Sequence, residues 1–347
     1  MVGVALARTA AGMRFNLSRN EIPYRPLPGV RAAVEAQIDH LACYPDPLAR
    51  ELGAAIAADL GVAETCVLPG HGSTGALITV LRAVRRPEAT VAFATPGFTG
   101  YGAIVRAAGA DPRPVAGRRG GWQPLDAMAA AVRADRNTVA VILTSPHNPS
   151  GEVVRAAELE AFVRMVPPTV LVILDEAYLD FDEGYEPAAI LAATSRHPNL
   201  VLTRSFSKAH GLAALRVGYA VGQPDFLRTA RAEMVAYDIG SSASLAAIAS
   251  LRHPRELAER VAEVRAVRDT LLTVVRRSGY PAPASFGNFV WLPTVGTAPL
   301  SAAFAARGVS VCEYPALGIR ITAATAQSVA AVSGVLEAFA AEQGATG

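Results

Sequence analysis

The 347-residue sequence lacks the charge imbalance that marks many nucleic-acid-binding proteins. Its 32 basic and 30 acidic side chains leave a formal net charge of +2, and neither sign is concentrated in one segment. This balance argues against nucleic acid as the partner. It favours a small-molecule substrate.

Cysteine and long apolar runs are scarce as well. Cys43, Cys66 and Cys312 are far apart and fit neither metal-ligand spacing nor a paired disulfide framework. This pattern is typical of a reducing compartment, so we expect a cytoplasmic protein without a bound metal. The most apolar runs, 139–143 and 170–174, are far shorter than the roughly 20 residues of a membrane-spanning helix. The first 13 residues lack the pattern of a signal peptide.

What the sequence does contain is an alternation of short apolar runs with alanine-rich stretches. A hydrophobic content of 51% supports a sizeable core. The alternation predicts a largely parallel sheet covered by helices. Because the runs lack polar alternation, both faces of these strands should be buried, and ligands should bind at their carboxyl ends. The expected strands are 91–94, 139–144, 170–174, 200–203 and 218–221.

The last third of the chain predicts a second, smaller domain. Residues 241–277 show apolar positions at helical spacing, and a turn follows at 278–283. Strands are expected at 289–292, 309–311 and 319–322, with a helix over about 327–339. We therefore expect an N-terminal arm (1–30), a large domain (31–245) and a small domain (246–347).

Lys208 is the residue most indicative of chemistry. It directly follows a predicted buried strand, in the segment S-F-S-K. A lysine there can act as a nucleophilic amine when nearby positive charge and desolvation lower its pKa. Ser205, Ser207 and Arg216 supply hydroxyl and guanidinium donors that suit a phosphate group. Alone, Lys208 would be read as an ordinary surface lysine, but the neighbouring donors favour a site.

This segment and several others resemble the fold-type I pyridoxal-phosphate (PLP) enzymes, and among them the histidinol-phosphate and aromatic amino-acid aminotransferases. The resemblance implies an α/β fold, with a mostly parallel seven-stranded sheet between helices in the large domain and a smaller α+β C-terminal domain. It also implies PLP as the cofactor and a transaminase activity. The matching motifs, in the family's order, are Y-P-D at 44–46, G-S-T at 72–74, P-G-F-T-G-Y at 96–101, N-P-S-G at 148–151, D-E-A-Y at 175–178, S-F-S-K at 205–208 and R-I-T at 320–322.

The resemblance implies a role for each residue around the cofactor. Lys208 would form the Schiff base with PLP and carry the proton. Asp175 would keep the pyridine nitrogen protonated, as a buried carboxylate can, although in isolation Asp175 reads equally well as a helix N-cap. Tyr178 and Asn148 would donate to the ring oxygen, and Phe98 would stack on the ring. The phosphate would be held by Gly72, Ser73, Thr74, Ser205, Ser207 and Arg216.

The resemblance also implies substrate contacts and a partner. Arg320 stands in an apolar strand, and a buried arginine needs an anionic partner. That partner could be a structural carboxylate, but the family's arginine here binds the substrate's α-carboxylate. Further substrate contacts are expected from Asn20, Tyr24 and Asn288, and Phe98 and Tyr314 are candidate contacts of the substrate's side chain as well. Tyr44 corresponds to a tyrosine that reaches the neighbouring subunit's cofactor phosphate, so a homodimer with shared active sites is expected.

Two positions depart from the family pattern. Histidinol-phosphate aminotransferases usually carry an arginine in a V-x-V-R segment, where this chain has Cys312 followed by Glu313. Arg25 stands where the family commonly has glycine. A phosphate-bearing substrate would lose a counter-charge at Cys312. We therefore expect an aromatic or otherwise specialised L-amino acid as donor and a 2-oxo acid as acceptor, with ping-pong kinetics.

Three alternatives stay open at this point. Histidinol phosphate is one donor that the family includes, and a decarboxylase or another PLP enzyme of specialised metabolism is a second possibility. Aminotransferase-like domains also occur in transcription regulators behind a helix-turn-helix domain. The resemblance begins by Asn20, so we do not expect that domain here.

Overall fold

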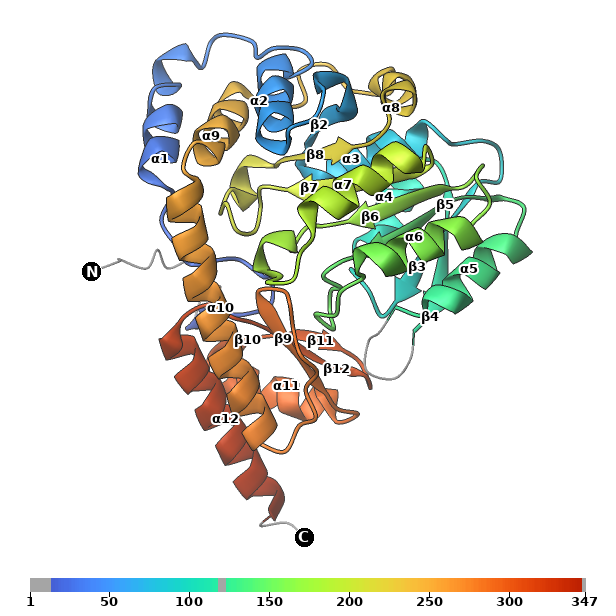
Figure 1. Cartoon of the computed structure of the whole chain (residues 1–347). Coiled ribbons are helices and arrows are strands. Elements are labelled where there is room, and N and C mark those ends of the chain that lie inside the picture. Colours follow the sequence, from blue (N-terminus) through green and yellow to red (C-terminus); the bar gives the residue numbers. More distant parts are fainter. Residues whose placement is uncertain (1–13, 118–122, 345–347) are drawn as a thin grey trace.

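A seven-stranded sheet forms the centre of the computed structural model, which describes residues 14–117 and 123–344 (Figure 1). From one edge to the other, the strands are β2 (Val67–His71), β8 (Val217–Val221), β7 (Leu200–Ser205), β6 (Leu171–Asp175), β5 (Thr138–Thr144), β3 (Thr90–Thr95) and β4 (Asp111–Ala116). Neighbours from β7 to β4 pair in parallel. The predicted mostly parallel sheet is confirmed.

Strand β8 is the exception to the parallel arrangement. It pairs antiparallel with both β2 and β7. A parallel return needs a crossover of a dozen or more residues, usually through a helix. The connection from β7 to β8 holds only the 3-10 turn η4 (Ala213–Leu215), so the chain comes back antiparallel.

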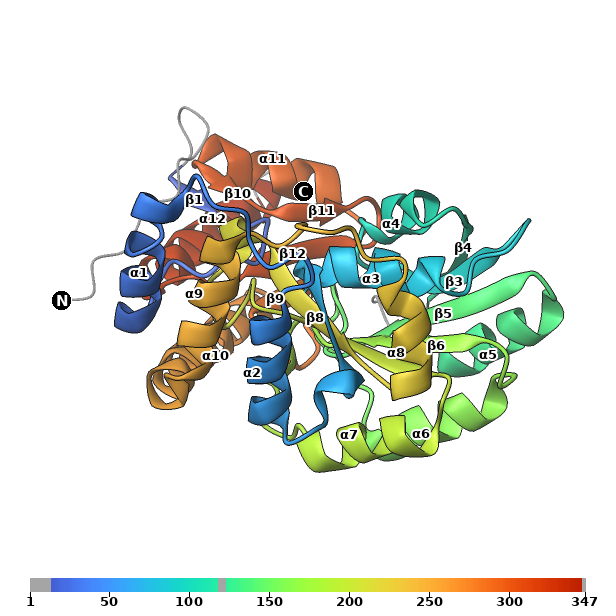
Figure 2. The same ribbon diagram turned by 90° about the horizontal axis from the view of Figure 1, so that it is seen from above.

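Helices cover both faces of the sheet (Figure 2). Consecutive strand residues alternate between two buried clusters, as Leu143 and Leu174 face one and Ile142 and Ile173 face the other. One face is covered by α2 (Arg50–Leu60), α5 (Leu125–Ala134), α6 (Ala156–Met165), α7 (Pro187–Arg196) and α9 (Ser241–Leu251). The other is covered by α3 (Gly72–Arg82), α4 (Tyr101–Ala107) and α8 (Pro224–Arg231). Burial on both faces is therefore confirmed. Helix α1 (Pro28–Glu35) packs against α9.

The strands that the sequence did not predict in the large sheet lie at its edges. Strand β4 contains two prolines, which edge positions tolerate because they need fewer ladder hydrogen bonds. Strand β2 contains a proline and a glycine. These residues interrupt the apolar pattern that marks a buried strand, so both segments escaped prediction.

A second core lies beyond helix α10 (Pro254–Arg277), which runs beside α12 (Ala326–Gly344) in Figure 1. Its antiparallel sheet has the order β11 (Cys312–Tyr314), β12 (Gly318–Thr322), β9 (Phe289–Pro293), and α11 (Thr297–Ala306) packs against it. The strand expected at 309–311 is divided, since β10 (Val309–Ser310) pairs with β1 (Phe15–Asn16) instead. The α+β character of this unit is confirmed, while the three domain boundaries stay a prediction.

Within the described ranges, no helix is long and apolar enough to cross a membrane. The same residues contain no group of three or more His, Cys, Asp or Glu side chains placed to hold a metal ion.

Candidate active site

The predicted site residues gather at the carboxyl ends of the parallel strands. Asp175 ends β6, and in the sheet it lies between Thr144 of β5 and Thr203 of β7. Asn148 follows β5, and Lys208 follows β7. Parallel strands direct their carboxyl ends to one edge, and this explains why motifs far apart in the sequence meet.

Asp175 is buried and has one occupied and one open oxygen. Tyr101 Oη donates a 2.8 Å hydrogen bond to Oδ2, and the same hydroxyl lies 2.8 Å from Thr144 Oγ1. Oδ1 is buried without a hydrogen-bond partner among the described residues. Burial raises the pKa of Asp175 to about 6, although the bond from Tyr101 lowers it. A cationic N–H placed at Oδ1 would satisfy this acceptor and favour the carboxylate.

Tyr101 was given no role by the sequence reasoning. The available signal was its place in the P-G-F-T-G-Y segment that also holds Phe98. Phe98 is 37% exposed and contacts Tyr101 edge-on, with ring centroids 5.3 Å apart. The aromatic that was expected to stack on the cofactor therefore lies next to the tyrosine that holds Asp175.

Lys208 lies against the N-terminal segment. Its Nζ donates to the backbone carbonyls of Arg19, at 3.1 Å, and Asn20, at 3.2 Å. Nζ is also 5.4 Å from the centroid of the Tyr178 ring. Asn20 Nδ2 donates to Tyr178 Oη at 2.9 Å, and Asn288 Nδ2 donates to Asn20 O at 3.1 Å. The structure thus brings these predicted residues together.

Arg320 is buried and bonded only to neutral acceptors. Its Nη1 donates to Asn148 Oδ1 at 2.6 Å, and its Nη2 donates to Ser18 O. Its Nε has no partner in the described part of the chain. An amide and a carbonyl do not balance a buried positive charge. Arg320 is therefore placed to bind the carboxylate of a substrate. The alternative, pairing with an Asp or Glu of the chain, is not seen among the described residues.

The opposite end of the site has the features of an anion cradle. Ser73 and Thr74 lie in the first turn of α3, where free N–H groups and the helix dipole favour negative charge. Arg216 Nη1 donates to Ser207 Oγ at 3.3 Å, and Ser207 N donates to Ser205 Oγ at 3.0 Å. Gly72 has φ +70°, and a Cβ there would lie 2.5 Å from Arg216 Nη2. Glycine is therefore required where the guanidinium meets the helix start.

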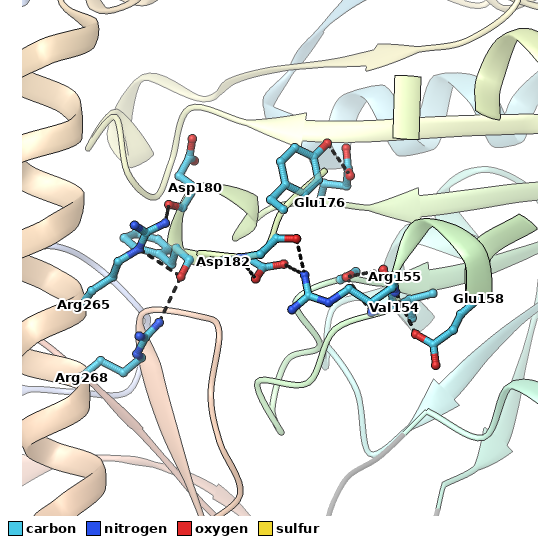
Figure 3. A network of polar contacts seen from close by, with 12 residues as sticks. Val154, Arg155, Glu158, Glu176, Asp180, Asp182, Arg265 and Arg268 are labelled. Carbon is cyan, nitrogen blue, oxygen red and sulfur yellow. Dashed lines mark hydrogen bonds and ion pairs between the residues drawn. The ribbon is translucent and has the colours of Figure 1, made fainter. Parts of the chain in front are cut away.

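Two arginines of α10 and one that precedes α6 hold the segment that follows Tyr178 (Figure 3). Arg265 and Arg268 of α10 donate to the carbonyls of Asp180, at 2.8 Å, and Phe181, at 3.1 Å. Arg155, just before α6, donates to Asp182 Oδ2 at 2.7 Å. The sequence reasoning missed all three arginines, because no local spacing links them to residues 180–182.

Two predicted residues form no hydrogen bond to the other site residues in the described part of the chain, although Tyr24 packs against the apolar cluster that contains Tyr178. The Tyr24 ring faces Arg260 of α10, with the guanidinium carbon 5.8 Å from its centroid. Burial, followed by the negative charge of Glu263, raises the pKa of Tyr24 to about 12. Tyr44 is 86% exposed, and its ring lies 5.2 Å from that of Tyr237. The roles expected for Tyr24 and Tyr44 stay predictions.

The residues present fit pyridoxal phosphate. The open Oδ1 of Asp175 is an acceptor for a protonated ring nitrogen, and the start of α3 with Arg216 is a cradle for the phosphate. Lys208 supplies an amine, and the Asn148 amide and Tyr178 hydroxyl supply donors between these two ends. The buried guanidinium of Arg320 would be balanced by the carboxylate of an amino acid.

Comparisons with known proteins agree with this chemistry. Residues 13–332 match the family described as aminotransferase class I and II. An aromatic amino acid aminotransferase of Thermobifida fusca (strain YX) is 38% identical over 312 residues, which is 90% of this chain and 86% of that protein. One from Streptomyces avermitilis is 36% identical over 318 residues, 91% of this chain and 88% of that protein. The structure of a Sinorhizobium meliloti histidinol-phosphate aminotransferase with pyridoxal-5'-phosphate superposes with a TM-score of 0.83 at 26% identity, covering 94% of this chain and 92% of that one.

Proposed function

Because the chain belongs to the class I and II aminotransferases, we propose that it transfers the amino group of an aromatic L-amino acid to a 2-oxo acid. Its general activity, PLP-dependent transamination on a fold-type I scaffold, follows from the family. The observation that supports an aromatic donor is the strand register beside Arg320. Cys312 is the cross-strand partner of Arg320, so their side chains point to the same face of the sheet.

This register matters for the choice of substrate. A donor with a distal phosphate needs a cation near the carboxylate-binding arginine, and the side chain beside Arg320 is a thiol. Glu313, the next residue, pairs with Ile319 and points to the opposite face, so it supplies no cation there either. A neutral aromatic side chain needs no such counter-charge. The names of the relatives from Thermobifida fusca and Streptomyces avermitilis support the same choice.

The positions of Asp175 and Lys208 support a chemical role for each. Bound PLP supplies an electron sink that makes the donor's Cα–H acidic. Asp175 Oδ1 keeps the ring nitrogen protonated. Lys208 Nζ takes the proton from Cα and delivers it to the cofactor carbon. The carbonyls of Arg19 and Asn20 accept hydrogen bonds from the protonated amine.

Binding and orientation are assigned to the remaining residues. Arg320 holds the α-carboxylate and fixes the Cα–H bond relative to the ring, which decides the bond that breaks. Asn148 and Tyr178 donate to the ring oxygen. The phosphate is held by Gly72, Ser73, Thr74, Ser205, Ser207 and Arg216. Asn20 and Asn288 shape the substrate side of the site, and Phe98 covers the ring.

The proposal includes a homodimer with shared active sites. The surface around Tyr44 supports this, because large exposed apolar side chains gather there, and such patches mark interaction sites. Tyr237 N also donates to Pro47 O at 3.0 Å, which joins the two segments of the patch. The exposed apolar residues in these segments are Ile38, Leu41, Tyr44, Leu48, Val235 and Tyr237. A cytoplasmic location is also part of the proposal, supported by three free thiols.

The decisive experiment is a half-reaction screen of the PLP-loaded enzyme. Phenylalanine, tyrosine, tryptophan, aspartate and histidinol phosphate are each mixed with it, and the visible absorbance of the bound cofactor is followed. The aromatic donors are expected to convert the cofactor to its amine form with the highest kcat/KM and to yield a keto acid. Preference for histidinol phosphate would overturn the substrate assignment. Release of carbon dioxide without a keto acid would instead support the decarboxylase alternative.

A further inference from the structure

Tyr314 links the small sheet to two cofactor-facing loops of the large unit. Its hydroxyl lies 3.3 Å from Gly97 O, in the loop that carries Phe98, and 3.4 Å from Asn148 Oδ1. Burial raises the pKa of Tyr314 above its usual range, so the hydroxyl stays protonated and can donate. One hydroxyl therefore lies between the two loops that flank the ring site.

The contacts of Asn148 define which way its amide faces. A guanidinium can only donate, so the Asn148 atom 2.6 Å from Arg320 Nη1 is the oxygen. Tyr314 approaches the same oxygen as a second donor. With Oδ1 directed at these two residues, Nδ2 is left to face the ring oxygen of the cofactor.

The two donors differ in what happens when substrate binds. Arg320 is the proposed carboxylate ligand, so the substrate competes with Asn148 for its N–H groups. The Tyr314 hydroxyl is shared between Gly97 O and Asn148 Oδ1, and neither contact is one that a substrate carboxylate would take, since both partners are acceptors. The ring itself is held by packing. Trp291 contacts it edge-on at 5.3 Å between centroids. The contact passes over Gly318, where a Cβ would lie 2.4 Å from Trp291 Cζ2.

We propose that Tyr314 is a positioning residue, whose hydroxyl keeps the Asn148 amide oriented toward the cofactor while Arg320 exchanges its contacts for the substrate carboxylate. The inference deepens the proposed function and rests on it. Tyr314 touches neither the transferred group nor the proton, and it acts through Asn148. Its effect is therefore on the ring oxygen that Asn148 contacts.

The test is Tyr314→Phe, which removes only the hydroxyl. The readout is the pH titration of the bound cofactor's visible absorbance. A hydrogen bond from Asn148 favours the anionic ring oxygen, so a loosened amide should move the titration midpoint to higher pH. We expect kcat to fall about fivefold, the loss of one ordinary hydrogen bond, with a smaller change in KM. The unfolding temperature should stay close to that of the wild type.

Two further variants make the result decisive. Tyr280→Phe makes the same chemical change at a tyrosine packed against the small unit's core, and it should leave the titration unchanged. In an Asn148→Ala background, Tyr314→Phe should shift the midpoint no further, because the residue it acts through is gone. Equal shifts in both backgrounds, or no shift at all, would overturn the inference. A wild-type protein that forms no cofactor absorbance would instead overturn the proposed function.

Discussion

Tyr101 donates a 2.8 Å hydrogen bond to Oδ2 of Asp175, while Oδ1 of the same carboxyl is buried with no partner among the described residues. Burial raises the pKa of Asp175 to about 6, and the hydrogen bonds that lower it, the one from Tyr101 first, do not offset the cost of burial. A cationic nitrogen of the cofactor would stabilise the ionised carboxyl. In the cofactor-free protein, the buried ionised carboxyl lowers the stability of the fold.

The first prediction concerns the pH dependence of that cofactor-free protein. The folded pKa of Asp175, about 6, lies above the ordinary aspartate value of 3.8, so the folded chain binds the proton more tightly. The stability from this proton is present below pH 3.8 and is lost as the pH rises through about 6. The loss amounts to about 3 kcal/mol at most. Asp175→Asn should remove it.

Urea unfolding of both cofactor-free proteins, measured between pH 4 and pH 8, checks this prediction. Other groups titrate equally in the two proteins, so the difference between the curves isolates Asp175. The variant should gain stability relative to the wild type as the pH rises. Parallel curves would show that the carboxyl is not strained in the folded state.

Much of the fold and of the cofactor site was predictable from the sequence, because the signals are local. The buried strands are continuous apolar runs, and the residues at their ends, such as Asp175 and Lys208, stand in short motifs. The antiparallel direction of strand β8 was not predictable, because direction depends on how the chain returns and not on the composition of the strand. The residues of β8 would look the same either way.

The contacts that the sequence did not reveal join residues far apart along the chain. Tyr101, which was given no role, lies 74 positions from Asp175. Tyr314 was expected only as a substrate contact, and it lies 166 positions from Asn148. A tyrosine on an apolar helix or strand is indistinguishable from a core residue until its hydroxyl has a known neighbour. Substrate contacts are harder still, because they depend on the register of β11 against β12.

The second prediction tests the phosphate cradle through Gly72→Ala. The added Cβ would lie 2.5 Å from Arg216 Nη2, at a residue with φ +70°. Gly61→Ala is the matched control, since Gly61 has φ +66° and nothing within 4 Å of the added Cβ. Both variants should lose about 1 kcal/mol of stability through backbone strain. Only Gly72→Ala should weaken PLP binding, by about tenfold if one charge-assisted hydrogen bond is lost. Equal PLP affinities in a fluorescence titration would contradict the cradle.

The third prediction addresses the choice of substrate. Cys312→Arg places a cation beside Arg320, on the same face of the sheet. A charge-assisted bond to phosphate should raise kcat/KM for histidinol phosphate about tenfold or more relative to phenylalanine. Cys312→Gln lengthens the side chain without adding charge, and it should leave the ratio near the wild-type value. If the glutamine variant gained as much as the arginine variant, size and not charge would set the preference.

The fourth prediction tests whether two subunits share each active site. In the proposed dimer, Tyr44 of one subunit completes the site that holds Lys208 of the other. Tyr44→Ala should therefore damage the partner's site, and Lys208→Ala should inactivate the subunit's own site. When the two variants are mixed and allowed to exchange subunits, about half of the dimers are mixed and each has one intact site, so activity should recover to about a quarter of the wild-type value.

Mixing Lys208→Ala with Asp175→Asn is the control. These two residues belong to the same subunit's site, as their neighbouring strands show, so no mixed dimer contains an intact site. Recovery in both mixtures, or in neither, would mean that Tyr44 does not serve the partner's site.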